Sequence, residues 1–458
     1  MNRTHQQILQ LALPAIVTNI TVPLLGLVDS AIVGHMGSAV YIGAVAVGAM
    51  VFNLVYWVFG FLRMGTSGLT AQARGRRDMA GAGALLRRSA TVSLAIAALI
   101  VALQWPLREL MLWFIAPTPD VRPLAVAYYN IVVWGAPAVL GLYSLTGWFI
   151  GMQNTRLPML VSILQNMVNI VASLCLVYGL GWRIEGVAVG TLVAQYAGFL
   201  VAGALLWRYY RKPLCLRRTA AAAPVGGGGS PVGGGGPSVG GGGSPAGGGG
   251  SSFAAFFRVN RDIFLRTLCL VAVNLYFTAA GARQGATVLA VNTLLMQLYL
   301  LFSYVMDGFA YAGEALGGRY WGAQNRGAFR DVVRRLFHWG AAMTLLFTMV
   351  YVLGGMPFLR LLTDEPSVVE ASRQYVWWAY LIPAAGVAAF VWDGIFIGIT
   401  ATRGMLLSSA VATLVFFLSV LLLLPALANH ALWLAQLLYL ATRGTVQTAY
   451  YVRHCLPS

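Results

Sequence analysis

The stretch Gly147-Trp148-Phe149-Ile150-Gly151, followed by Thr155-Arg156, has a counterpart later in the chain. Gly394-Ile395-Phe396-Ile397-Gly398 is followed by Thr402-Arg403, at a constant offset of 247 residues. A repeat of this kind carries one apolar segment onto another that runs in the same direction. The chain is therefore predicted to consist of two homologous halves with the same orientation in a membrane.

Composition places the chain in lipid. Of its 458 residues, 59% are hydrophobic and only 9% are charged, and the mean hydropathy is +0.74. This leaves too little polar surface to cover a water-soluble globule of that size. The net charge of +17 lies mainly in short loops between apolar segments, with no nucleic-acid-binding signature beside it. The bilayer is therefore an expected partner, and nucleic acid is not.

Apolar windows and their breakers predict twelve transmembrane helices, each near or above the ~20 residues that cross a hydrocarbon core. Arginine gathers in alternate loops, for example from Arg74 to Arg88 and from Arg319 to Arg335. By the positive-inside rule, both termini are expected to be cytoplasmic. The predicted spans are 8–34, 41–71, 88–106, 123–151, 157–181, 186–208, 262–282, 285–316, 334–355, 370–399, 404–425 and 431–451.

Glycine, serine and proline make up most of the stretch from Pro224 to Ser252. Such a tract has almost no side chains that could order it, and it behaves as a flexible tether. The predicted domains are therefore an N-terminal six-helix lobe over 1–212, a cytoplasmic linker over 213–258 and a C-terminal six-helix lobe over 259–458. The predicted fold class is an all-α membrane protein with two homologous bundles.

Asp29 is the leading candidate for ion coupling. An ionisable group inside a membrane costs at least ~2.5–3.5 kcal/mol, so it needs a partner or a function. Asp29 follows Pro23, which removes a backbone hydrogen bond and bends the helix. Thr18 lies about three turns earlier on the same face. The alternative is that Asp29 pairs locally with a polar neighbour.

The fifth predicted span carries a polar stripe that must face the protein interior or water. Its members are Ser162, Asn166, Asn169 and Ser173. Hydrogen bonds between helices explain any one of them as well as a binding role does. Thr191 adds a further polar position on the sixth span.

Three acids stand in the second half of the chain. Asp307 and Glu314 share one face of the eighth span, and Asp393 immediately precedes the repeated glycine motif. Arg63 and Arg283 are the intramembrane cations expected to pair with them, and salt-bridged helices are favoured over a second ion site. We find no metal-binding spacing of Cys or His and no enzyme motif. No metal, organic cofactor or catalytic residue is therefore predicted.

Several motifs resemble the multidrug and toxic compound extrusion (MATE) family, in particular its DinF-like branch. The run NITVPLLGLVD from Asn19 to Asp29 is similar to the first helix of that family. Further matches are Leu62-Arg63-Met64, VMDGFAYAGE from Val305 to Glu314, and Trp392-Asp393-Gly394. The resemblance implies twelve helices in two lobes around a V-shaped cavity. It also implies export of cationic or amphipathic organic compounds in exchange for protons or sodium ions.

The resemblance also assigns residues. The titrating acid of the first helix falls on Asp29, and its polar partners fall on Asn169 and Thr191. Where relatives often carry a second acid, this chain has Ser173. Because hard cations favour several oxygen ligands with negative charge, this change weakens a sodium site. The further candidates for the cavity or the second lobe are Thr18, Asn166, Ser173, Asp307, Glu314 and Asp393.

The expected function is therefore export of drugs or toxic compounds across the bacterial inner membrane by a monomeric, proton-coupled antiporter. Asp29 is the expected coupling residue, and Pro23 is the expected helix-bending residue. Sodium is kept as a second possible coupling ion. The alternative is a lipid-linked saccharide flippase of related architecture. Such a flippase should line its cavity with many arginines, and few arginines stand within the predicted spans.

Overall fold

A computed structural model describes residues 3–34, 39–220, 253–363 and 365–455. Within these ranges, the structure describes the backbone alone for residues 22–30, 34, 39, 212–220 and 253. The described residues form helices and no β-strand, which confirms the predicted all-α fold class.

The N-terminal lobe contains two predicted spans that are each made of two helices. α2 and α3 are separated by Phe59 and Gly60, and a 3₁₀ turn, Val133–Gly135, joins α6 to α7. The helices of this lobe are α1 (Arg3–Gly34), α2 (Ala39–Val58), α3 (Phe61–Gly75), α4 (Met79–Ala102), α5 (Gln104–Ile115), α6 (Val121–Val132), α7 (Ala136–Gly151), α8 (Arg156–Leu174) and α9 (Ile184–Ala220).

The C-terminal lobe is built from long helices that each match one predicted span. Ten helical runs in the described residues are long and apolar enough to cross a membrane, and α1 and α15 are not among them. The count of twelve spans therefore stays a prediction. The helices of this lobe are α10 (Phe253–Arg283), α11 (Ala286–Gly322), α12 (Arg326–Leu362), α13 (Pro366–Ile399), α14 (Thr402–Leu427) and α15 (Asn429–His454).

Helix extends into both ends of the predicted linker. α9 continues to Ala220 and α10 begins at Phe253, so the range 213–258 includes helical residues on each side. The glycine-rich tract itself lies outside the described residues, which exclude 221–252. The predicted tether and the domain division over 1–212 and 259–458 thus remain predictions.

α5 is a helix that lies almost entirely outside the predicted spans, since the span 88–106 includes only its first three residues. Its twelve residues are too few to cross a bilayer, and they include the charged residues Arg108 and Glu109. Trp105, Trp113 and Phe114 are 68%, 78% and 58% exposed. Aromatic residues of this kind gather at the boundary between membrane and water, where short amphipathic helices also lie. α5 therefore fits a position in the membrane interface.

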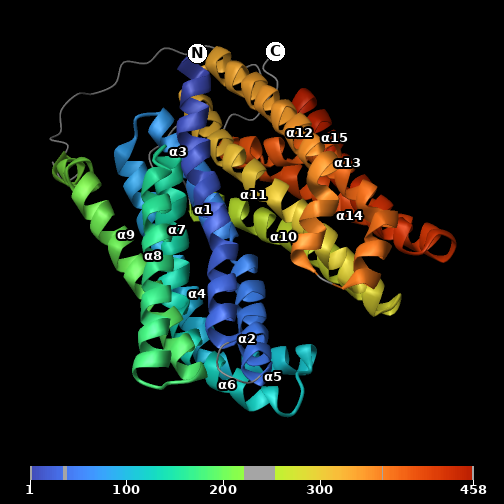
Figure 1. The fold of residues 1–458 in the computed structure, drawn as a ribbon. Helices are drawn as coiled ribbons and strands as arrows, with labels where there is room; N and C mark the ends of the chain where they lie inside the picture. Colours follow the sequence, from blue (N-terminus) through green and yellow to red (C-terminus); the bar gives the residue numbers. More distant parts are fainter. Residues whose placement is uncertain (1–2, 35–38, 221–252, 364, 456–458) are drawn as a thin grey trace, which may run out of the picture.

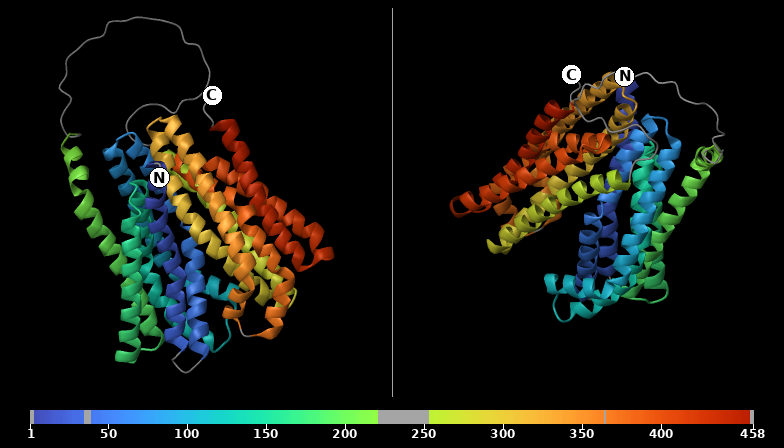
Figure 2. Two further views of the ribbon diagram at one scale, coloured as in Figure 1. Left: turned by 45° about the horizontal axis from the view of Figure 1, so that its top comes forward. Right: turned by 180° about the vertical axis from the view of Figure 1, so that it is seen from behind.

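The two lobes form a V. Figures 1 and 2 show the helix ends nearest the two termini close together and the opposite ends spread apart. The N-terminus and the C-terminus lie on the same side, next to the narrow end. This arrangement confirms the two-lobed, V-shaped architecture that the resemblance implied.

The repeated glycine motif brings helix backbones into contact within each lobe. A Cβ added to Gly147 would lie 2.3 Å from the carbonyl oxygen of Arg63 on α3. A Cβ added to Gly394 would lie 2.3 Å from the carbonyl oxygen of Ala310 on α11. Arg63 and Ala310 are themselves related by the 247-residue offset. Small residues permit this close approach of membrane helices, so the repeat records the same packing in both lobes.

Equivalent residues also meet across the seam between the lobes. Ser67 and Glu314 are 247 positions apart, and the Ser67 hydroxyl donates a hydrogen bond of 2.7 Å to the Glu314 carboxylate. Two equivalent positions can touch only where a symmetry axis passes between them. The lobes are therefore related by a pseudo-two-fold axis that runs through this contact.

A second set of contacts obeys the same symmetry. Gln72 Nε2 donates to Thr400 Oγ1 at 3.1 Å, and Arg319 Nη1 donates to Gln153 Oε1 at 3.1 Å. The offset of 247 carries Gln72 onto Arg319 and Gln153 onto Thr400. Two hydrogen bonds at symmetry-related positions thus close the narrow end of the V.

We predict that a side chain added to the seam destabilises the protein. A Cβ at Gly75 would lie 2.1 Å from the Arg319 carbonyl oxygen, and one at Gly322 would lie 2.3 Å from that of Gln72. Gly75→Val and Gly322→Val should each lower the free energy of unfolding by about 1–3 kcal/mol. The measurement is thermal unfolding of the purified protein in detergent. Gly203→Val is the matched control, because its Cβ meets nothing within 4 Å. Equal melting temperatures for all three variants would contradict the prediction.

Candidate functional site

A cavity of about 380 Å³ lies between the two lobes. Its wall is formed by α1, α2, α3, α7 and α8 of the first lobe and by α10, α11 and α13 of the second. Trp57, Leu142 and Tyr143 give the wall an apolar part, whereas Arg63 and Asp307 give it charge. A concave wall that is mostly apolar with a few polar groups is typical of a site for small organic molecules.

α1 carries three of the predicted site residues. Thr18 lines the cavity, and its hydroxyl donates a hydrogen bond of 2.9 Å to the Pro14 carbonyl oxygen. Pro23 and Asp29 lie in the same helix, but their side chains are outside the described part of the protein. Their roles in helix bending and ion coupling stay predictions.

Asn169 and Ser173 of α8 are buried and form a small polar group with Thr191 of α9, which is half-buried. Asn169 Nδ2 donates to Thr191 Oγ1 at 3.2 Å, and Thr191 Oγ1 donates to the Val187 carbonyl oxygen at 3.0 Å. Ser173 lies against Gly190, next to Thr191 in the sequence. The Asn169 Oδ1 and Ser173 Oγ atoms are buried, and neither has a hydrogen-bond partner among the described residues. Unpaired buried oxygens are the kind of atoms that an ion or water satisfies.

Asn166 and Ser162 connect α8 to α1. Asn166 Nδ2 donates to the Thr21 carbonyl oxygen at 3.0 Å, and the Thr21 and Ser162 hydroxyls are 3.1 Å apart. Thr21 lies about two turns before Asp29 on α1. Asn166 therefore holds the two helices together, whereas Ser162 also lines the cavity.

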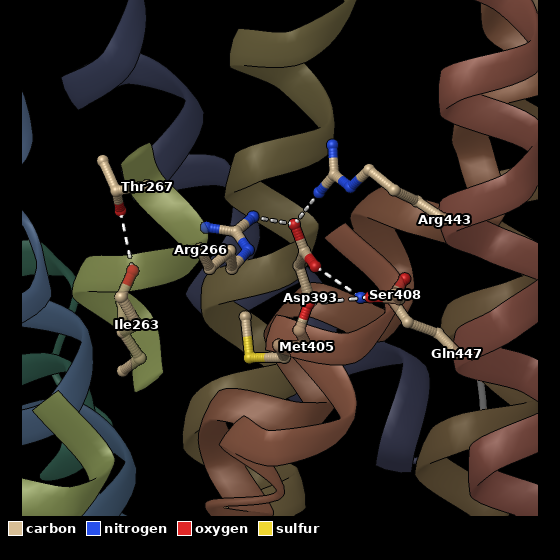
Figure 3. A network of polar contacts seen from close by, with 8 residues as sticks. All are labelled: Ile263, Arg266, Thr267, Asp393, Met405, Ser408, Arg443 and Gln447. Carbon is tan, nitrogen blue, oxygen red and sulfur yellow. Dashed lines mark hydrogen bonds and ion pairs between the residues drawn. The ribbon is translucent and has the colours of Figure 1, made fainter. Parts of the chain in front are cut away.

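Asp393 is held by three side chains in the second lobe. Figure 3 shows Arg266 from α10 and Arg443 from α15 directed at one carboxylate oxygen, and Gln447 directed at the other. The Arg443 contact is 2.5 Å and the Gln447 contact is 2.6 Å. All four side chains are buried. Because two guanidinium groups share one carboxylate, this cluster carries a net positive charge and disfavours a bound cation.

Arg266 and Arg443 are site residues that sequence reasoning missed. Both lie inside predicted spans, and an arginine at that depth needs an anionic partner, which is the signal that could have found them. Arg283, which was expected to pair with an acid, is exposed at the end of α10 and forms no ion pair with any residue that the structure describes.

Glu314 is paired across the seam. Arg63 Nη1 lies 3.4 Å from its carboxylate, and the Arg63 guanidinium lies 4.4 Å from the centre of the Tyr311 ring, within cation–π range. Asp307 lines the same cavity and is half-buried. Within the described ranges, no hydrogen bond or ion pair reaches its carboxylate. Of the three predicted acids of this lobe, two are therefore paired, and Asp307 has no such partner in the part of the chain that the structure describes.

Comparisons with known proteins agree with this geometry. The MatE family model matches residues 14–174 and 263–422, one segment in each lobe. DNA damage-inducible protein F of Escherichia coli K12 is 38% identical over 444 residues, which cover 97% of this chain and 91% of that protein. The probable multidrug resistance protein NorM of Thermotoga maritima is 22% identical over 382 residues, which cover 81% of this chain and 74% of that protein.

Solved structures share the fold. A MATE crystal structure in the bent conformation has a TM-score of 0.82 at 18% identity, covering 99% of this chain and 95% of the other. The Vibrio cholerae MATE transporter VcmN in the bent form has a TM-score of 0.80 at 16% identity, covering 98% and 96%. The resemblance to the DinF-like branch is confirmed by the identity with the E. coli protein over almost the whole chain. This chain therefore belongs to the MatE family, whose members are transporters and not enzymes.

Proposed function

We propose that this protein is a secondary antiporter that exports small organic compounds across the bacterial inner membrane in exchange for protons. The observation that carries the proposal is a partly apolar, partly charged cavity between two homologous lobes. Sites at the interface of repeats are typical of transporters that work by alternating access, in which one lobe rocks against the other. The seam contacts then form the gate on the side of the termini.

The direction of the cavity supports export. If both termini are cytoplasmic, as the arginine-rich loops predict, the V opens away from the cytoplasm. The structure then corresponds to the state from which substrate leaves the cell. Protonation of Asp29 would remove a charge beside Pro23, change the bend of α1 and favour this release.

Each lobe offers too few negatively charged oxygen ligands for a sodium ion, and this favours protons as the coupling ion. In the first lobe, Asn169, Thr191 and Ser173 supply neutral oxygens, and Asp29 supplies one formal charge. In the second lobe, two guanidinium groups surround Asp393. Sodium, like other hard cations, needs several oxygen ligands with compensating negative charge, whereas a proton needs only one carboxylate.

The charges of the cavity wall disfavour the flippase alternative. The wall contains the arginines Arg63 and Arg266 and the acids Asp307, Glu314 and Asp393. Both arginines are engaged by acids of the same wall. A lipid-linked saccharide carries phosphate groups, which need unpaired cationic side chains. A wall with more acids than arginines suits a neutral or cationic substrate.

We predict that Asp29→Asn abolishes efflux driven by a proton gradient. The amide imitates the protonated acid and cannot release a proton, while its similar size should leave expression and folding intact. Ethidium efflux from proteoliposomes is the measurement. Asp120→Asn is the control, because Asp120 is exposed and its side chain makes no capping hydrogen bond. Full ethidium efflux by the Asp29 variant would rule out its role in coupling.

We predict that a pH gradient alone drives export. Efflux should persist in sodium-free medium and stop when the pH gradient is dissipated, because the first lobe lacks the second carboxylate that a sodium site needs. Proteoliposomes with separately imposed proton and sodium gradients provide the test. Ser173→Asp is expected to introduce a dependence on sodium. Sodium-driven efflux by the unmodified protein at constant pH would contradict proton coupling.

A further inference from the structure

We propose that Asp307 is the carboxylate of the cavity that binds either a proton or the positively charged group of the substrate, and not both at once. This inference rests on the proposed exchange of organic compounds for protons. It adds a residue in the second lobe that recognises the substrate, distinct from the coupling role proposed for Asp29.

Every other acid in the cavity wall is already engaged. The Glu314 carboxylate accepts a hydrogen bond from Ser67 and pairs with Arg63. Asp393 is held by Arg266 and its two partners from α15. These contacts stabilise the ionised form of both acids. Because their negative charges are already compensated, neither acid needs a positive charge from the substrate.

Asp307 differs from these acids although it shares their surroundings. It lies on α11, seven residues before Glu314 and on the same face of the helix, and it lines the cavity. Its side chain is half-buried, and among the residues that the structure describes it has no hydrogen-bond or ion-pair partner. A carboxylate in a largely apolar wall is costly unless a positive charge or a proton reaches it.

The charged groups that face Asp307 come from several helices. Arg63 on α3 and Arg266 on α10 attract its negative charge, while Glu314 on its own helix and Asp393 on α13 repel it. The neighbouring phenols of Tyr299, Tyr304 and Tyr311 are neutral groups near the same carboxylate.

The protonation state of Asp307 sets the net charge of the ionisable side chains around it. The three guanidinium groups are those of Arg63, Arg266 and Arg443, the last of which pairs with Asp393. The three carboxylates are those of Asp307, Glu314 and Asp393, so the net charge of these six side chains is zero while Asp307 is ionised. A proton on Asp307 leaves a net charge of +1. Because charges interact strongly in a low-dielectric wall, this change opposes a cationic substrate. Proton binding and cation binding at Asp307 therefore exclude each other.

The neighbouring side chains indicate the class of substrate. Trp57, Leu142 and Tyr143 supply aromatic and apolar surface in the same cavity. The face of Tyr311 is covered by Arg63, so it is not free to bind a second cation. The cavity thus fits an organic cation whose charge lies at Asp307 and whose apolar body lies against the first lobe.

The test measures equilibrium binding to the full-length protein in lipid nanodiscs. The probes are tetraphenylphosphonium, which is cationic, and triphenylphosphine oxide, which is neutral and similarly apolar. The unmodified protein should bind the cation tightly at alkaline pH and weakly at acidic pH. Asp307→Asn should bind the cation about tenfold more weakly or worse at alkaline pH, a change of about 1.4 kcal/mol. Its affinity should also fall less between alkaline and acidic pH than that of the unmodified protein, because the amide does not titrate.

Three controls distinguish a charge effect at Asp307 from misfolding and from titration of Asp29. Asp307→Glu should keep the pH-dependent binding, because the carboxylate is retained. Binding of the neutral probe should be the same in all variants, which shows that the cavity is folded. Asp29→Asn should still lose the cation at acidic pH.

Cation binding by Asp307→Asn with unchanged affinity and pH dependence would overturn the assignment. If the pH dependence disappears in Asp29→Asn instead, Asp29 and not Asp307 is the exchange site. If cation binding depends on Asp307 but no proton gradient drives efflux, the assignment of Asp307 stands and the proposed antiport is wrong.

Discussion

Backbone contact at glycine is the constraint on which the arrangement of this protein depends. In lipid, helices gain little from the hydrophobic effect, so they associate through close packing and hydrogen bonds. Gly147 and Gly394 let α7 and α13 approach the backbones of α3 and α11. α3 and α11 in turn meet at the pseudo-two-fold axis, where Ser67 donates to Glu314. The seam and the floor of the cavity both follow from these contacts.

The symmetry of the backbone contrasts with the asymmetry of the charges. The 247-residue offset pairs Asp393 with Thr146 and Asp307 with Gly60, and all four residues line the cavity. The acids therefore lie on the C-terminal side of the cavity, and their counterparts are neutral. The two homologous lobes thus give the cavity two different walls. The wall of the first lobe has hydroxyl and amide groups with Arg63 as its charged residue, whereas the wall of the second lobe has three acids and Arg266.

Much of the fold could be predicted from local sequence. Each predicted span falls on a helix or a pair of helices, because long apolar runs leave few alternatives in a membrane. α5 was missed because it is too short to span and carries charge. The partners of the acids were harder to predict, since Glu314 and Arg63 are 251 residues apart and Asp393 and Arg266 are 127 apart. A single sequence does not show which distant helices become neighbours.

The interfacial helix has a mechanical consequence. Figure 1 shows α5 at the wide end of the V, attached to the first lobe, while the corresponding region of the second lobe is the continuous helix α12. Aromatic side chains in the headgroup layer resist being pulled into hydrocarbon or out into water. The first lobe should therefore tilt less than the second. The rocking motion is then made mainly by the C-terminal bundle, while α5 holds the first lobe in place in the bilayer.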